Sequence, residues 1–332
     1  MKTLYLFYII LLLSACVNTK KSQTDNTITT AKSSKPVGPA FSADSAYAFC
    51  QQQCAFGPRT MNSDAHERCG QWIAAKFQSY GLTIAEQRAT LKGFNGTPLL
   101  SNNIMASYNP SQANRILICA HWDSRPWADN DPDEANWTKP VMAANDGASG
   151  VAVMLELARL LANTDTTQSP LPLGIDFVCF DAEDWGIDDV PESWALGAQY
   201  WSAHYNSSLA GGGSHLFGIL LDMVGGQGAR FYQEGYSLQY APDVVERVWK
   251  AAQVVGYGSI FPTKRGGNIT DDHGPVNEVA GIPCIDIIPY YPECEQSSFG
   301  PTWHTINDDM QHIDRNTLQA VGQTLVQVLF EY

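Results

Sequence analysis

The chain has 332 residues, of which 44% are hydrophobic and 16% are charged, and it carries a formal net charge of −14. Such a composition is typical of a folded globular protein and excludes a disordered chain, and the length suits one large α/β domain or two small ones. The negative charge disfavours nucleic acids and anionic membranes as electrostatic partners, so we expect no nucleic-acid partner.

The first residues have the pattern of an export signal. Lys2 is followed by the apolar run 4–13, which is too short to span a membrane comfortably, and the run ends in Leu-Ser-Ala-Cys at 13–16. This ending predicts a lipoprotein signal peptide over residues 1–15, with lipid attached to Cys16. In the alternative, an ordinary secretory signal, Cys16 has no such role.

The residues after the export signal are polar, and they predict a flexible tether over residues 16–40 between the lipid and the folded domain. Val17, in place of Asp, resembles lipoproteins that are sent on to an outer membrane. We therefore expect an exported bacterial lipoprotein that is periplasmic, is anchored to the outer membrane, and meets the membrane only through its lipid.

Seven cysteines follow Cys16, and an exported compartment permits disulfides between them. Cys119 and Cys179 lie inside apolar strand-like runs, so we expect both to be buried free thiols. The pairing of the others is not deducible from sequence. The candidates for a bridge are Cys50, Cys54 and Cys69, and separately Cys284 with Cys294.

From Phe41 onward the chain predicts a single domain, 41–332, because no linker-like stretch divides it. Helical patterns are expected at 43–54, 63–80, 147–163, 193–206, 242–255 and 316–330. Apolar strand-like runs are expected at 82–87, 102–108, 115–120, 174–180, 216–222 and 283–288. This alternation predicts a three-layer α/β/α fold, in which helices cover both faces of a central mixed, mostly parallel, twisted sheet.

Acidic and histidine side chains follow the predicted strands. In open α/β sheets, ligands bind outside the carboxyl ends of the strands, so these side chains are expected at one edge. They are His121 with Asp123, Asp146, Asp181 with Glu183 and Asp184, Asp222, and Asp286 followed by His304. Neighbouring carboxylates at the end of a buried strand repel each other, which predicts a cation beside Glu183 and Asp184.

The types of these residues point to zinc. Asp146, Asp184 and His304 make a three-ligand site that leaves one zinc position open for catalysis. With His121 and Asp222 the set reaches the five ligands of a two-metal site that shares a bridging carboxylate. The residues alone do not decide whether the site holds one metal ion or two. No CxxC pair or Cys/His cluster indicates a thiolate zinc site.

Taken as a set, these motifs resemble a known family. His121-x-Asp123, Asn145-Asp146, Glu183-Asp184, Asp222, 271-DDHGP-275 and 303-WHT-305 resemble the zinc aminopeptidase superfamily M28. Within it they are most similar to the bacterial glutaminyl cyclases related to the animal enzymes, over roughly residues 65–332. The resemblance implies a zinc exopeptidase-like fold.

The resemblance also implies roles for individual residues. Asp146, Asp184 and His304 match the ligands of a single Zn²⁺ per chain, and Glu183 matches the catalytic acid/base. Asp222 and Asp271 match carboxylates of the adjoining hydrogen-bond network, with Asp286 a further catalytic candidate. Trp303 matches an aromatic residue of the substrate pocket, and Trp194 and Trp185 are further pocket candidates. The sequence departs from the animal enzymes at Gly147, where they have Ser, and at Asp286, where they have His.

The chemistry of these residues agrees with cyclisation of an N-terminal glutamine to pyroglutamate with release of ammonia. Holding the folded-back conformer supplies much of the rate, zinc polarises the γ-carbonyl, and Glu183 moves the proton. The expected partners are peptide or protein substrates that begin with Gln, and we expect a monomer.

The main alternative is a secreted two-zinc M28 aminopeptidase with His121 and Asp222 at the second metal, and a binding lipoprotein with a dead site is a third. Three features favour the cyclase: Trp303 before His304, Asp in place of the usual Glu in the Glu183-Asp184 pair, and the aromatic residues around the site.

Several residues near these motifs have no assigned chemistry. The role of Arg125 is open between pairing with Asp123 and meeting a peptide carbonyl. His273 is interpreted as structural or supporting, and Asp181 as support for the metal site. His66, His204, His215 and His312 fall in helical or loop patterns, and we expect them at the surface.

Overall fold

The computed structural model describes residues 35–164, 171–205 and 214–332. The predicted signal peptide, the lipidation site Cys16 and the tether as far as residue 34 lie outside the described residues. Within these ranges no helix is long and apolar enough to cross a membrane.

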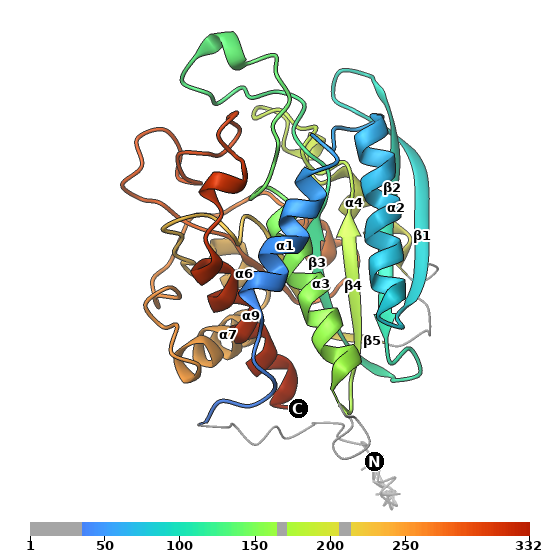
Figure 1. Ribbon diagram of the computed structural model, residues 1–332, viewed down its shortest axis with the longest axis vertical. Helices are drawn as coiled ribbons and strands as arrows, with labels where there is room; N and C mark the ends of the chain where they lie inside the picture. Colours follow the sequence, from blue (N-terminus) through green and yellow to red (C-terminus); the bar gives the residue numbers. More distant parts are fainter. Residues whose placement is uncertain (1–34, 165–170, 206–213) are drawn as a thin grey trace, which may run out of the picture. The chain divides into compact units, whose positions relative to one another are not determined.

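A six-stranded sheet forms the centre of the domain, with strand order β1-β2-β4-β3-β5-β6. Its strands are β1 (Thr83–Lys92), β2 (Pro98–Tyr108), β3 (Asn114–His121), β4 (Gly174–Phe180), β5 (Ser214–Leu221) and β6 (Cys284–Ile287). β4, β3, β5 and β6 run parallel, whereas β1 and β2 join the β4 edge as an antiparallel pair (Figure 1). This confirms the predicted mixed, mostly parallel sheet.

Burial on both faces explains the apolar strands at the centre. Every residue of β4 is buried, and β3 is buried from Arg115 onward. Successive side chains of a strand point to opposite faces. Accordingly, Ile116 and Ile118 pack in the larger core, and Leu117 and Cys119 pack in the smaller core on the other face. β1 is an edge strand, and from Ala85 onward its residues alternate between half-buried and exposed.

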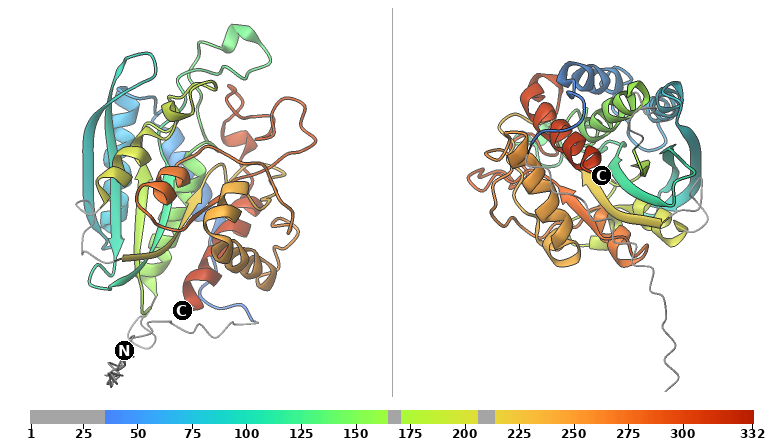
Figure 2. Two further views of the ribbon diagram at one scale, coloured as in Figure 1. Left: turned by 180° about the vertical axis from the view of Figure 1, so that it is seen from behind. Right: turned by 90° about the horizontal axis from the view of Figure 1, so that it is seen from below.

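Helices cover both faces of the sheet (Figures 1 and 2). α1, α2, α3 and α9 pack on one face, and α4 and α8 pack on the other. The helices are α1 (Ala43–Cys54), α2 (Asp64–Ser79), α3 (Ala148–Asn163), α4 (Leu196–Ala203), α6 (Gly235–Tyr240), α7 (Pro242–Val254), α8 (His273–Glu278) and α9 (Arg315–Phe330), with 3₁₀ turns η1 (Glu134–Asn136), η2 (Pro191–Ser193) and η3 (Met310–His312).

Several elements differ from the sequence prediction. β1 continues to Lys92 instead of ending at residue 87, because it pairs with β2 along its whole length although its second half is polar. The helix expected from residue 193 begins at Leu196, because Ala195 has φ +55 and breaks the helical path. α6 and α8 were missed, since six residues are too few for a clear 3.6-residue period.

The end of the predicted tether is part of the folded domain. The backbone N–H of Val37 donates to Gln327 Oε1 of α9 at 2.8 Å, and Gln327 Nε2 donates to the carbonyl of Lys35. Gly38 has φ +79, and a Cβ there would lie 2.6 Å from Val326. The prediction of a flexible tether is therefore wrong for residues 35–40, which pack on α9.

The seven described cysteines are free thiols. Neither of the bridges that the sequence left open, among Cys50, Cys54 and Cys69 or between Cys284 and Cys294, is formed. The prediction that Cys119 and Cys179 are buried free thiols is confirmed.

Candidate active site

Asp146, Asp184 and His304 come together at the carboxyl edge of the sheet. Asp146 precedes α3, Asp184 follows β4, and His304 lies in the loop after β6. One ligand atom from each lies within 4.8 Å of the other two. His304 Nε2 is 3.3 Å from Asp184 Oδ1 and 3.8 Å from Asp146 Oδ2.

The chemistry of this triad fits zinc. With metal–ligand bonds of about 2.0–2.1 Å, ligand atoms of a tetrahedral zinc lie roughly 3.3–3.4 Å apart. Asp184 Oδ2 is buried and has no hydrogen-bond partner. An unpaired buried carboxylate oxygen is costly, and a divalent cation would satisfy it. The three side chains would thus hold one zinc ion and leave a fourth position open to the cavity described below.

The loop that carries Asp146 is fixed by a buried acid. The backbone N–H groups of Asn145 and Asp146 donate to the carboxylate of Asp308 at 2.7 and 3.0 Å. Next to Asp146, a Cβ on Gly147 would lie 2.4 Å from the carbonyl oxygen of His121. A side chain at position 147 would therefore require this loop or His121 to shift.

His304 and Asp184 are positioned by backbone geometry and by one arginine. His304 has φ +54, an uncommon conformation for a histidine, and its carbonyl accepts a hydrogen bond from Asn130 N. Arg125 Nη1 lies 3.3 Å from Asp184 Oδ1, and Arg125 Nε donates to Asp129 at 2.7 Å. Of the two open roles of Arg125, pairing with Asp123 is not formed: Arg125 pairs with Asp129 and Asp184, and its Nη1 also donates to the backbone carbonyls of Asp184 and Gly186 at 3.2 and 3.3 Å.

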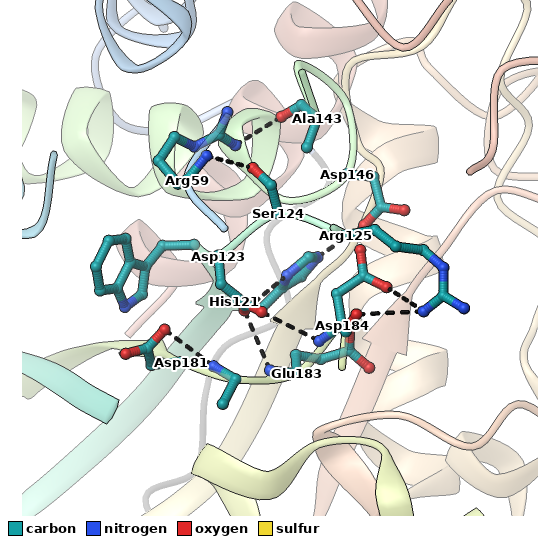
Figure 3. Close-up of polar contacts among 12 residues, drawn as sticks. Arg59, His121, Asp123, Ser124, Arg125, Ala143, Asp146, Asp181, Glu183 and Asp184 are labelled. Carbon is teal, nitrogen blue, oxygen red and sulfur yellow. Dashed lines mark hydrogen bonds and ion pairs between the residues drawn. The ribbon is translucent and has the colours of Figure 1, made fainter. Parts of the chain in front are cut away.

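Asp123 instead holds the loop after β4. Its carboxylate accepts the backbone N–H groups of Glu183 and Asp184 at 3.1 and 3.2 Å. Ala182, with φ +54, turns the chain just before them. In Figure 3 dashed lines join the carboxylate of Asp123 to the backbone of Glu183 and of Asp184.

Glu183 differs from Asp184 in its surroundings. Its side chain lines the cavity, whereas Asp184 meets His304 and Arg125. Burial raises the pKa of Glu183 well above its usual range, the charge of His121 opposes this rise, and the charges of Asp184 and Asp271 add to it. A bound divalent cation would also oppose it. A carboxyl with raised proton affinity at the cavity wall suits proton transfer.

A group of buried carboxylates lies beside Glu183. Burial raises the pKa of Asp222 to about 7 and raises the pKa values of Asp271, Asp272 and Asp286 above their usual range. Neither carboxylate oxygen of Asp272 or of Asp286 has a hydrogen-bond partner among the described residues. Carboxyl groups this close share protons instead of all ionising together.

Sequence reasoning named Asp222, Asp271 and Asp286 but missed Asp272. The doubled acid in 271-DDHGP-275 was the available signal. The same motif delivers His273, whose side chain is fully buried 3.3 Å from Glu234. His273 Nε2 faces Glu234 Oε2, its Nδ1 has no hydrogen-bond partner among the described residues, and His273 forms a close group with Asp271 and Asp286.

His121 lies between the zinc triad and this acidic group. Its Nε2 is 2.9 Å from Asp146 Oδ1 and 3.3 Å from Asp222 Oδ1. His121, Asp146 and Asp222 also bring ligand atoms within 4.8 Å of one another. The structure therefore assembles the second set of residues that a two-metal centre would use.

A cavity of about 230 Å³ opens above these groups. Its wall includes both Trp194 and Trp303, and the ring of Trp303 stacks on His304 with a centroid separation of 3.7 Å. Phe299 packs on Trp303 at 4.9 Å. The remaining lining residues are Asp146, Glu183, Asp188, Pro191, Asp222, Met223, Asn268, Ile269, Thr270, Asp271, Ile288 and His304.

Trp185 does not line this cavity, contrary to the prediction. Its ring packs edge-on against Trp127 with a centroid separation of 5.0 Å. The next residue, Gly186, makes room for the ring of Trp194, which would lie 2.0 Å from a Cβ there. Trp194, the other pocket candidate named from the sequence, lines the cavity as predicted. Sequence reasoning missed Phe299 and Ile269, which carry no motif.

The prediction of surface histidines is wrong for His66 and His215. His66 Nε2 lies 2.8 Å from Asp181 Oδ1, and its ring stacks on Trp122. His215 is buried 2.9 Å from Asp176. Each histidine has a buried acid that lies far away in sequence, which periodicity cannot reveal. His204 is exposed as predicted, and His312 is partly exposed.

Asp181 supports the site from below. Besides His66, its carboxylate accepts the backbone N–H groups of Asn102 and Ala182 at 2.6 and 2.9 Å. The interactions tie the end of β4 to β2 and to α2. Asp181 is therefore a structural anchor of the loop that carries Glu183 and Asp184.

Comparison with known proteins places this fold and site. The model of peptidase family M28 matches residues 103–329. The crystal structure of a glutaminyl cyclase from Bacteroides thetaiotaomicron is 48% identical, with a TM-score of 0.83, and the match covers 89% of this chain and 99% of that one. A leucine aminopeptidase precursor from the same species is also 48% identical, with a TM-score of 0.81 and the same coverage.

Among curated proteins, the aminopeptidase YwaD of Bacillus subtilis is 29% identical over 76% of this chain. The chain spans about half the length of that relative, 49%. The family match and the likeness over nearly the full length of the solved relatives agree with the fold. The chain belongs to peptidase family M28.

Proposed function

We propose that this protein is a zinc-dependent glutaminyl cyclase, an acyltransferase that converts the N-terminal glutamine of peptides and proteins to pyroglutamate. The observation that carries the proposal is the 48% identity to the Bacteroides thetaiotaomicron glutaminyl cyclase over 99% of that chain. The site supports it, because Glu183 and two of the proposed zinc ligands, Asp146 and His304, line one cavity with Trp194 and Trp303.

The proposed reaction needs no water. The α-amine nitrogen of the glutamine attacks its own γ-carboxamide carbon, the new C–N bond closes the ring, and the bond to the amide nitrogen breaks to release ammonia. Glu183 accepts the amine proton and gives it to the leaving nitrogen. Zinc, when bound, would polarise the γ-carbonyl as a Lewis acid. Asp222, Asp271 and Asp286 share protons beside Glu183 and keep its proton affinity high.

The cavity walls suit the glutamine side chain. Trp303, Trp194 and Ile269 offer apolar surface for its methylenes, while Glu183 and Asp222 supply polar groups at the same cavity. Reaction requires a folded-back glutamine, and close walls that hold this conformer raise the rate.

We further propose one zinc per chain. The separation of 2.9 Å between His121 Nε2 and Asp146 Oδ1 is a normal hydrogen-bond distance. It is shorter than the roughly 3.3 Å expected between two ligands of one zinc. In this arrangement His121 donates to Asp146 and orients it, as outer residues commonly do for metal-bound carboxylates.

A two-zinc aminopeptidase is the second candidate function. His121, Asp146 and Asp222 form a complete second ligand group, and the leucine aminopeptidase precursor is 48% identical to this chain. Incubation of the zinc-loaded protein with a Gln-initiated peptide separates the two functions by mass. Loss of one ammonia from an intact chain supports the cyclase, whereas release of free glutamine contradicts it. Metal analysis of the same sample counts the zinc.

We also propose that the protein is a periplasmic lipoprotein, anchored through Cys16, that acts as a monomer on exported proteins beginning with Gln. The motif Leu-Ser-Ala-Cys at 13–16 supports the lipid anchor. Mass analysis of the N-terminal peptide from the native protein tests it, with Cys16→Ser as the control. An unmodified N-terminus at Cys16 or elsewhere would contradict the anchor, and sedimentation of the soluble domain tests the monomer.

A further inference from the structure

A second cavity, of about 440 Å³, adjoins the reaction cavity, and we call it the side groove. The two cavities share a wall, which consists of Pro191, Trp194, Ile269, Thr270 and Asp271. The side groove extends from this wall over α4, α6 and α8 and over the loop of η2. Figure 2 shows α4 and α8 on one face of the sheet.

The rest of the side groove combines apolar surface with acidic groups. Tyr236, Tyr240 and Val279 supply apolar contacts, and Val279 is 59% exposed. Glu192 and Glu278 are its exposed acids. The hydroxyl of Tyr240 donates to Glu278 Oε1 at 2.6 Å, which fixes that carboxylate at the rim.

No lysine or arginine lines either cavity among the described residues. Arg125, the cation nearest to Trp194, is paired with Asp129 and Asp184. Arg265 donates to Asn268, which lines the reaction cavity and is absent from the side groove. The side groove is therefore negative, with Asp271 at its junction with the reaction cavity.

We propose that the side groove binds residues two to four of the substrate peptide and favours basic side chains there. The inference rests on the proposed cyclase function. A glutamine bound at Glu183 is joined through its own carbonyl to the rest of the peptide, which must leave the reaction cavity. The shared wall gives this chain a continuous path, and each extended residue spans about 3.3–3.6 Å. Acidic groups along the path attract Lys or Arg and repel Asp or Glu.

Three synthetic substrates test this inference. They are glutamine amide, Gln-Ala-Arg-Ala-amide and Gln-Ala-Glu-Ala-amide. At low ionic strength we expect kcat/KM of the Arg peptide to exceed that of the Glu peptide about three- to tenfold, as expected for a few partly exposed charge pairs. The ratio should shrink at about 1 M salt, where the Debye length is about 3 Å.

Each outcome has a distinct meaning. Glutamine amide has no downstream residues, so its failure to cyclise overturns the proposed function itself. If all three substrates are cyclised and the two peptides have equal kcat/KM, the proposal for the side groove is overturned and the proposed function stands. A preference for the Glu peptide overturns it as well.

Variants of the side groove test whether its charges cause the preference for the Arg peptide. In the double variant Glu192→Gln with Glu278→Gln, the Arg/Glu ratio should fall towards one, and Val279→Lys should reverse it. Asp64→Asn is the matched control, because Asp64 is an exposed acid on α2, which packs on β1 and β2. The control should keep the wild-type ratio. An unchanged ratio in the double variant, with glutamine amide turnover as the check on folding, contradicts the assignment.

Discussion

Glu183 and Asp184 are adjacent acids with different contacts, and these contacts support the different tasks that we propose for them. Asp184 meets His304 and Arg125, and one of its oxygens is left for a metal. Glu183 has its backbone fixed by Asp123 and its side chain at the cavity. The division lets one residue bind the cation while its neighbour exchanges protons.

Substitution of each acid should separate the two tasks. We expect Glu183→Gln to keep its zinc and lose about 10²–10⁴-fold in kcat, the usual contribution of a general acid/base. Asp184→Ala should lose zinc as well as activity, because one of three protein ligands is gone. Metal analysis after dialysis, with turnover of a Gln peptide, measures both. Equal loss of metal in the two variants would show that the roles are not divided.

Trp303 and Trp185 form a matched pair of tryptophans. The Trp303 ring stacks on His304 in the cavity, whereas the Trp185 ring packs on Trp127 outside it. Trp303→Ala should therefore raise KM about tenfold, which corresponds to about 1.4 kcal/mol of lost apolar contact. Trp185→Ala should leave KM near the wild-type value. Steady-state kinetics measures KM for both variants. A larger rise in KM for Trp185→Ala than for Trp303→Ala would contradict the assignment of Trp303 to the cavity wall.

At the scale of elements, a buried ionic cluster joins four strands at the end of the sheet opposite to the site. Asp176 of β4 accepts from Arg115 Nη2 of β3 at 2.7 Å, lies 2.9 Å from His215 of β5, and accepts from Ser107 of β2. Arg115 and Asp176 are almost completely buried. Buried charges of this kind are costly unless each keeps its partner.

Asp176→Asn should therefore destabilise the fold by about 3–5 kcal/mol, because Arg115 would be left buried without its counter-charge. Urea unfolding at neutral pH measures the loss. Asp243→Asn, an exposed acid in the first turn of α7, is the control and should change the free energy of unfolding little. A loss below about 1 kcal/mol at Asp176 would mean that the cluster does not stabilise the sheet.

The same cluster predicts how stability depends on pH. Burial favours a raised pKa for Asp176, but hydrogen bonds from His215 and Arg115 outweigh it and hold the pKa below its usual value. A carboxyl with a depressed folded-state pKa stabilises the protein above its unfolded pKa, about 3.9, and this stabilisation is lost as the pH falls below that value. Wild-type stability should thus fall more steeply than that of Asp176→Asn between about pH 4 and 2.

At the scale of the whole molecule, the proposed zinc ion joins segments that are far apart in sequence. Asp146, Asp184 and His304 precede α3, follow β4 and follow β6, respectively. Removal of zinc by a chelator should abolish activity and lower the free energy of unfolding. At free zinc near 100 times Kd the expected difference is about 2.7 kcal/mol. Thermal unfolding with and without chelator measures it, and activity that survives complete zinc removal would contradict the mechanism.

The sequence was sufficient for the sheet and for the zinc triad because both depend on local patterns. Apolar runs such as 174–180 identify strands buried on two faces, and the acids that follow them identify the carboxyl edge. The polar half of β1 and the short helix α8 carry no such pattern. Their structure comes from pairing with β2 and from packing against β5 and β6.

Contacts between distant residues account for the errors at the site. Periodicity placed His66 and His215 at the surface, but their partners Asp181 and Asp176 lie in another part of the sequence. Trp185 was expected in the pocket because it follows Asp184. Gly186 has no side chain and so leaves room for the ring of Trp194. Which tryptophan reaches the cavity therefore depends on the three-dimensional path of the loop.

The packing of residues 35–40 on α9 fixes the point at which the folded domain begins. These residues lie beside the carboxyl end of α9, away from the carboxyl edge of the sheet where the zinc triad lies (Figure 1). If the proposed lipid is attached at Cys16, the anchored segment would therefore join the domain at the end opposite to the zinc triad, so that the reaction cavity does not lie at the point of attachment.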